Sequence, residues 1–149
     1  MKLPEEIVSL LKIKGINDTA VYLATSSLDG NINLMPSPYT DVYLDEYILI
    51  PDLFAQKTKV NLNENRHGLI SIVLPTGDKN ITIEGPGNII QWGHPAKFRF
   101  YDLTAGDILE HWGNWTEKEN LLDDENQAKP EVFAQRGVIV IKAEKIIYN

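Results

Sequence analysis

The sequence contains no cysteine among its 149 residues. A disulfide framework, a thiolate metal site and a cysteine nucleophile are therefore excluded. No stretch reaches the roughly 18 consecutive apolar residues that a membrane-spanning helix requires. The amino terminus is too acidic, and its apolar run too short, for a signal peptide. We therefore expect a cytoplasmic protein with no membrane partner.

Positive charge is also scarce, since 14 Lys and Arg stand against 21 Asp and Glu and give a net charge of −7. Nucleic acid binding depends on a broad basic face that neutralises phosphates, so this class of partner is disfavoured. A local cluster of Lys57, Lys59 and Arg66 can still hold a single phosphate ester. That pattern suits a mononucleotide cofactor.

Common catalytic motifs are missing. His67, His94 and His111 show neither the i, i+4 spacing nor the HExxH arrangement of zinc ligands, so no metal site is expected. No serine lies in a Gly-x-Ser-x-Gly elbow, and no motif marks a carboxylate pair for glycoside cleavage. The sequence therefore assigns no catalytic residue.

The length and the 43% apolar content fit one hydrophobic core, so residues 1–149 are expected to form a single domain. Residues 4–14 read as a helix, with acidic residues at the start, lysines at the end and Gly15 as the stop. Apolar runs and alternation predict strands at 19–26, 31–39, 47–51, 67–74 and 79–91.

Two hairpins are expected among these strands. Asp29-Gly30 is a two-residue turn signal between the first two strands, whose inward positions we predict to be Val21, Leu23, Ile32 and Leu34. The strands at 67–74 and 79–91 form the second hairpin. Gly85-Pro86-Gly87 predicts a bend or bulge within its second strand.

Residues 50–65 (IPDLFAQKTKVNLNEN) are the most informative stretch, because a short apolar strand leads through a loop into a predicted helix that begins with Lys57 and Thr58. The first N–H groups of a helix lack intrahelical partners and carry partial positive charge, so a phosphate can bind there beside a lysine. Taken alone, the same residues also fit an ordinary exposed turn.

The order LATSSLDGNINLMPSP, YILIPD, KTKVNLNEN and HGLISIVL resembles the pyridoxamine 5′-phosphate oxidase-like FMN-binding split barrels, especially their small single-domain members. The resemblance covers residues 19–92 well and 136–147 more loosely. It implies a mainly β protein: an antiparallel, Greek-key-like split β-barrel of about six strands with a few short helices. The helix at 4–14 would cover one mouth of this barrel. Residues 93–130 follow no family pattern, and the carboxy-terminal Arg/His substrate motif of the true oxidases is absent.

The resemblance also implies FMN as the cofactor, held in a groove at the interface of a homodimer. Lys57 would neutralise the phosphate and Thr58 would donate a hydrogen bond to it. Phe133 or Trp92 could reach over from the partner subunit. The other implied contacts are Pro36 and Ser37 along the ring and ribityl chain, and main-chain groups of Ile50, Pro51 and Asp52. The segment Pro36-Ser37-Pro38 fits equally well a protected edge strand.

These features predict an FMN-dependent oxidoreductase or electron-transfer flavoprotein that exchanges electrons with an unidentified donor or acceptor. The absent substrate motif argues against a true pyridoxamine 5′-phosphate oxidase. Three alternatives stay open: a non-catalytic flavin-binding or sensing module, a haem-binding variant of the same barrel, and a barrel that binds sugar or oligonucleotide without flavin.

Overall fold

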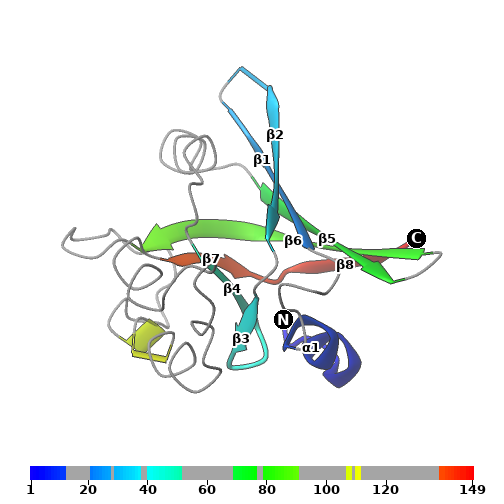
Figure 1. Ribbon diagram of the computed structural model, residues 1–149, viewed down its shortest axis with the longest axis vertical. Coiled ribbons are helices and arrows are strands. Elements are labelled where there is room, and N and C mark those ends of the chain that lie inside the picture. Colours follow the sequence, from blue (N-terminus) through cyan, green and yellow to red (C-terminus); the bar gives the residue numbers. More distant parts are fainter. Residues whose placement is uncertain are drawn as a thin grey trace, which may run out of the picture.

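The computed structural model describes residues 1–12, 21–27, 29–37, 40–51, 69–76, 79–90, 107–108, 110–111 and 138–149. The labelled elements in Figure 1 are one helix of eight residues and eight strands. In chain order the elements are α1 (Glu5–Lys12), β1 (Val21–Ser26), β2 (Ile32–Ser37), β3 (Asp41–Tyr43), β4 (Tyr47–Pro51), β5 (Leu69–Thr76), β6 (Lys79–Ile90), β7 (Val138–Lys142) and β8 (Lys145–Tyr148).

The strands form one antiparallel system in the order β2-β1-β5-β6-β7-β4-β3, and β8 pairs with β6 beside this path. Among the described strands, β2, β3 and β8 each pair on one side only; β2 and β3 are the two ends of the main strand path and so border the opening of the barrel. This architecture confirms the mainly β, antiparallel split-barrel prediction. It divides the barrel into eight strands where the sequence suggested about six, because the apolar run near the carboxyl terminus is broken into β7 and β8 and because β3 was not predicted.

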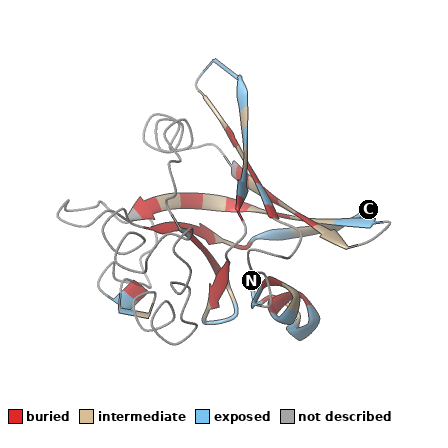
Figure 2. Ribbon diagram, in the orientation of Figure 1, coloured by how far each residue is buried: buried red, intermediate tan, exposed pale blue. Residues whose placement is uncertain are grey.

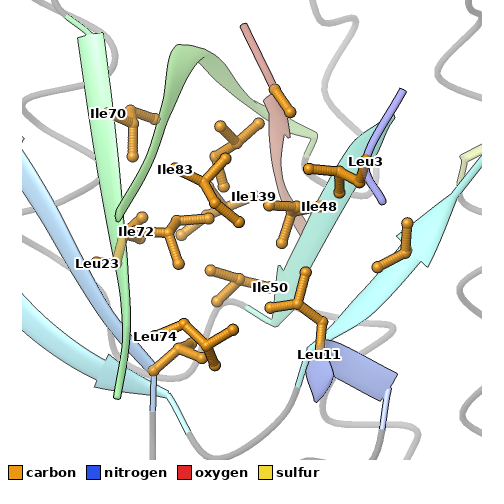
Figure 3. Close-up of a cluster of buried hydrophobic side chains, with 14 of the residues drawn as sticks. Leu3, Leu11, Leu23, Ile48, Ile50, Ile70, Ile72, Leu74, Ile83 and Ile139 are labelled. Carbon is orange, nitrogen blue, oxygen red and sulfur yellow. The ribbon is translucent and has the colours of Figure 1, made fainter. Parts of the chain in front are cut away.

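The main core lies inside this barrel and is built from aliphatic side chains of every strand from β1 to β7 except β2 and of α1. Figure 3 shows Leu23, Ile72 and Ile83 from one part of the sheet meeting Ile48 and Ile139 from the other. Burying each such side chain contributes about 1.5–3 kcal/mol. Helix α1 adds Ile7, Val8 and Leu11 from its apolar face, which confirms that it covers the barrel interior.

Strands β4 and β7 are buried on both faces, which explains their continuous apolar sequences YILIP and VIVIK. Ile48 and Ile141 belong to the main core. Leu49 and Val140, their neighbours in sequence, point to the opposite face and are also fully buried. The β4–β7 pair is therefore the centre of the fold, and the position of its ends is fixed by packing on both sides.

Strand β6 serves both parts of the barrel and changes partners at Gly85-Pro86-Gly87. Its pairing with β8 ends at Glu84 and Lys145, and its pairing with β7 begins at Gly87 and Ile141. Two residues of β6 thus face three residues, 142–144, of the β7–β8 arm. The predicted irregularity is confirmed at this position, with the extra residue of the bulge in the partner strand.

The β1–β2 hairpin was predicted, but two of its details differ. Ser27 N–H donates to the Asn31 carbonyl and Gly30 N–H to the Ser27 carbonyl, so three residues rather than two separate the last pair. Gly30 has φ +85°, whereas Asp29 does not have positive φ, as in a three-residue loop that ends in a left-handed glycine.

Two of the four residues predicted to point inward from this hairpin do so. Val21 and Leu23 are fully buried, whereas Ile32 and Leu34 are 77% and 60% exposed. The register explains the error, because Leu23 pairs with Met35 and Ala24 pairs with Leu34. Met35 therefore shares the core face, and Ile32 and Leu34 lie on the outer face. Figure 2 shows this exposed side of β2 in pale blue.

Strand β3 was missed because it has only three residues and ends in a turn without a glycine. Leu44 and Asp45 both adopt positive φ, 54° and 55°, a conformation that side chains other than Gly, Asn and Asp rarely take. Sequence rules for hairpin turns therefore give no signal here. Within the described residues, no helix combines the length and apolar character needed to cross a membrane.

Candidate functional site

The carboxyl end of β2 carries two of the residues that the resemblance assigns to the flavin, Pro36 and Ser37. They point to opposite faces, since Pro36 pairs with Tyr22 and is exposed, whereas Ser37 pairs with Val21 and is 2% exposed. Strand β2 is an edge of the sheet, and Pro36 contributes no main-chain donor to that edge. The edge position of β2 agrees with the edge-strand interpretation, and the role of Pro36 and Ser37 as flavin contacts stays a prediction.

The carboxyl end of β4 carries Ile50 and Pro51. The Ile50 side chain is fully buried in the main core, so only its main chain can meet a ligand, in keeping with the main-chain role predicted for it. On one side both residues pair with β7, opposite Ile139 and Val138. On the other side the β3–β4 ladder ends at Asp41 and Leu49, so Ile50 and Pro51 lie beyond it.

Both strand ends are connected to Asp41, the first residue of the edge strand β3. Ser37 is only four residues before Asp41, so their Cα atoms are at most about 15 Å apart. Asp41 in turn lies directly opposite Leu49, the residue before Ile50. The fold thus places the predicted contacts of β2 and β4 near Asp41, although Ser37 and Ile50 are 13 residues apart in the sequence.

The remaining predicted site residues, Asp52, Lys57 and Thr58, lie outside the described residues, as do Trp92, Phe133 and the stretch 93–106. Lys57 follows Pro51, the last residue of β4, by six residues in the sequence. Its role at the phosphate stays a prediction.

The structure adds one pair that the sequence did not reveal. The Nε2 atom of His111 lies 2.7 Å from Oδ2 of Asp41, and the Asp41 side chain is 3% exposed against 35% for His111. The Tyr43 ring lies 4.9 Å from the imidazole at a tilt of 55°. Asp41 thus fixes the orientation of an accessible imidazole beside the split. Their 70-residue separation left no local motif to find them.

The same contact has a structural role, because it ties the helical residues 110–111 to the first residue of β3. Asp41 is on the Leu49 side of the sheet, the face opposite the main core, and Ile108 of the same helical stretch is fully buried. The pair uses Nε2 and leaves Nδ1, which is bonded to Cγ, the ring carbon that carries the side-chain stem, and is therefore the more hindered nitrogen for a haem iron. The described residues hold no cluster of three or more His, Cys, Asp or Glu that could bind a metal ion.

We expect Asp41→Ala and His111→Ala each to lower the free energy of unfolding by about 1–3 kcal/mol, because each leaves the other polar group partly buried without its partner. The double variant should lose less than the sum of the single losses, with a coupling of about 0.5–3 kcal/mol. Asp41→Asn keeps an acceptor oxygen and should lose less than Asp41→Ala. Urea unfolding of the four variants measures this, and strictly additive losses would contradict the pairing.

One open cavity of about 350 Å³ lies elsewhere, lined by Leu3, Glu5, Val8 and Asp45. Asp45 belongs to the turn at the far end of the β3–β4 hairpin from Asp41. Two carboxylates at its wall would repel a phosphate ester. This cavity is therefore a poor candidate for a nucleotide cofactor, and the split between β2 and β3 is the better one.

Comparison with known proteins supports the fold. No family model and no curated protein matches the sequence. Solved structures match along the whole chain. A candidate pyridoxamine 5′-phosphate oxidase from Lactobacillus delbrueckii is 18% identical with a TM-score of 0.61, covering 98% of this chain and 93% of that one.

Two further matches carry different names. An FMN-binding protein from Syntrophomonas wolfei is 19% identical, with a TM-score of 0.51 and coverage of 97% and 89%. HutZ, described as a heme storage protein of Vibrio cholerae, is 14% identical, with a TM-score of 0.57 and coverage of 99% and 94%. The protein therefore has the split-barrel fold of the pyridoxamine 5′-phosphate oxidase-like proteins, a fold used for both flavin and haem.

Proposed function

We propose that this protein is an FMN-binding flavoprotein that acts as an oxidoreductase or electron-transfer protein. The observation that carries the proposal is that the carboxyl end of β4 lies opposite Asp41, four residues after the carboxyl end of β2, beside the edge strand β3. A ring-shaped ligand along strand ends and a phosphate near a lysine are the two halves of an FMN site. The compartment we expect is the cytoplasm.

The residues present fit the chemistry of FMN. The phosphate needs a cation and hydroxyl or N–H donors, which Lys57 and Thr58 would supply. The isoalloxazine ring needs flat surfaces and main-chain polar groups, for which exposed Pro36 and the β4 main chain beyond the β3–β4 ladder are suited. Ser37 and Asp52 would complete the contacts.

The flavin would supply the electron chemistry, and the protein would supply orientation and electrostatics. Strand β4 is held rigidly because it is buried on both faces, so its main chain would fix the ring position. We assign no catalytic residue. The electron donor or acceptor is unidentified.

The cofactor would lie at the interface of a homodimer. The split is open along β2 and β3, so one subunit alone would leave much of a flavin ring in water. Trp92 or Phe133 of a second copy would be candidates to cover it.

The absorption spectrum of the purified protein tests the proposal. Flavin absorption, with FMN released on denaturation, supports it. A haem spectrum would favour the haem-binding variant, and a colourless protein that does not take up added FMN would refute flavin binding. Reoxidation of the reduced protein by candidate acceptors then separates the two flavin roles, since turnover supports an enzyme and slow, acceptor-independent reoxidation supports a non-catalytic module.

We expect no appreciable oxidation of pyridoxamine 5′-phosphate. That substrate brings a second phosphate, and the only arginines are Arg66, Arg99 and Arg136, none of which lies in the terminal substrate motif of the true oxidases. An assay for pyridoxal 5′-phosphate with the FMN-loaded protein checks this. Turnover near 1 per second or more, roughly the lower end of usual enzyme rates, would overturn the expectation.

A further inference from the structure

The Asp41–His111 pair has the geometry of a base that a buried carboxylate holds in place. Nε2 of His111 lies 2.7 Å from Oδ2 of Asp41. A carboxylate only accepts hydrogen bonds, so Nε2 of the neutral ring donates, and the lone pair of Nδ1 is left for another partner. Among the described residues, the structure shows no hydrogen bond to that second nitrogen. The imidazole therefore retains an atom that can accept a proton.

The two members of the pair differ in their access to water. The Asp41 side chain is 3% exposed, whereas the His111 side chain is 35% exposed. A small molecule can reach the ring, while the carboxylate behind it is shielded. A proton that binds at Nδ1 gives the ring a positive charge, which the neighbouring carboxylate balances. This is the division of work between the two members of an Asp–His pair in general base catalysis.

The surroundings hold the imidazole in one orientation. The Tyr43 ring lies 4.9 Å from it at a tilt of 55°. Ile108, on the same helical stretch as His111, is fully buried and anchors that stretch. The charged residues described there, Asp107 and Glu110, are exposed. The ring is thus fixed by the contact with Asp41 and by packing, as a positioned base requires.

We propose that Nδ1 of His111 is the proton acceptor for a small molecule bound beside the edge strand β3, and that Asp41 is the residue that positions it. The small molecule presents an O–H or N–H group, as an alcohol or an amine does. In the proposed step this bond breaks, its electron pair stays on the oxygen or nitrogen, and the proton binds Nδ1. Asp41 stays ionised and keeps its hydrogen bond from Nε2.

The inference deepens the proposed function and rests on it only for the identity of the reaction. Oxidation of an alcohol or amine by a flavin removes a hydride from carbon, and the proton on the oxygen or nitrogen needs a separate acceptor. His111 would be that acceptor. The geometry of the Asp41–His111 pair is observed without reference to flavin, so the two proposals can fail separately.

The first measurement is the tautomer of His111 in the protein as purified, from long-range proton–nitrogen NMR spectra recorded where the ring is neutral. The signals are assigned with His111→Gln. We expect the Nε2–H form in the parent chain and a mixture of both forms in Asp41→Asn, because an amide can either accept from Nε2 or donate to it. An Nδ1–H form in the parent, or an unchanged tautomer in Asp41→Asn, would overturn the inference.

The second measurement is base catalysis by the same protein, with 5-nitrobenzisoxazole as the probe. A base removes the proton on the carbon of its heterocyclic ring, the electron pair forms a nitrile, and the N–O bond breaks to release a coloured phenolate. The reaction needs no oxidant. His111→Gln keeps an N–H donor for Asp41 but has no basic nitrogen, so it separates proton acceptance from the structural role of the pair. Glu110→Gln is the matched control, because it removes an exposed carboxylate from the same helical stretch.

The parent chain should accelerate the ring opening over buffer. His111→Gln should lose about 100-fold or more of this acceleration, the lower end of what a positioned base contributes. Asp41→Asn should lose roughly 10-fold, because its ring is no longer fixed with Nδ1 free and the imidazolium loses its counter-charge. Glu110→Gln should keep the parent rate. Circular dichroism and thermal unfolding confirm that each variant is folded.

A parent chain that does not accelerate the reaction overturns the inference, as does a folded His111→Gln that keeps the rate or an equal loss in Glu110→Gln. A protein that has this base but takes up no FMN supports the inference and refutes only the proposed function. A flavin-binding protein without the base does the reverse.

Discussion

Lys57→Ala is expected to weaken FMN binding by roughly 10- to 150-fold, which corresponds to about 1.5–3 kcal/mol for a lost charge-assisted hydrogen bond. Riboflavin has no phosphate, so its affinity should hardly change. Thr58→Val should show the same selectivity with a smaller loss, about 0.5–1.5 kcal/mol, because a neutral hydroxyl donates the bond. Titration of both ligands against the flavin-free variants measures these differences.

The pair of ligands is the control for this experiment. A variant that merely loosens the fold would weaken riboflavin and FMN together. If Lys57→Ala lowers both affinities equally, or neither, then the phosphate is not held at Lys57 and the sequence-based site is wrong. Such a result would still leave the split of the barrel as the place for the ring.

Gly85→Ala is expected to cost about 4 kcal/mol or more of folding stability, or to prevent folding. A Cβ atom at Gly85 would lie 1.7 Å from the carbonyl oxygen of Lys142 and 2.8 Å from its carbon. These are main-chain atoms of the bulge where β6 changes partners, so they cannot move away without disrupting the barrel. Circular dichroism and urea unfolding measure the loss.

Gly87→Ala is the matched control, two residues along the same strand. Its Cβ would lie 1.8 Å from Cδ1 of Ile70, the end of a flexible side chain that can adopt another rotamer. We expect a smaller loss of about 1–3 kcal/mol, typical of overpacking. If Gly85→Ala lowers the free energy of unfolding no more than Gly87→Ala does, the bulge can relax. Strand β6 would then not need a glycine where it changes partners.

Much of the fold follows from local patterns. The helix was predicted at 4–14 and lies at Glu5–Lys12, because its acidic start, apolar spacing and glycine stop are all local. The strands β1, β2, β4, β5 and β6 were also predicted within a few residues of their bounds. The change of partners at Gly85-Pro86-Gly87 was visible because proline and glycine restrict or relax the backbone wherever they occur.

The candidate site likewise contains residues that were predicted before the structure and residues that only the structure revealed. The family resemblance named Pro36-Ser37 and Ile50-Pro51, which lie at the carboxyl ends of β2 and β4. The Asp41–His111 pair could not, because 70 residues separate its members and only the folded chain brings them within 2.7 Å. Strand β3, which positions Asp41, gave no signal either, as its turn uses Leu44 and Asp45 with positive φ.

The sequence by itself determined the helix α1 and the strands β1, β2, β4, β5 and β6, the neutral character of β1, β2 and β5, and the presence of a lysine and threonine suited to a phosphate. Only the tertiary structure decided which face of β2 points inward. Alternation specifies that two rows of side chains exist, but both rows of β2 contain apolar residues, Ile32 and Leu34 in one and Met35 in the other. The pairing of Leu23 with Met35 settles the choice, because register is a property of two strands together.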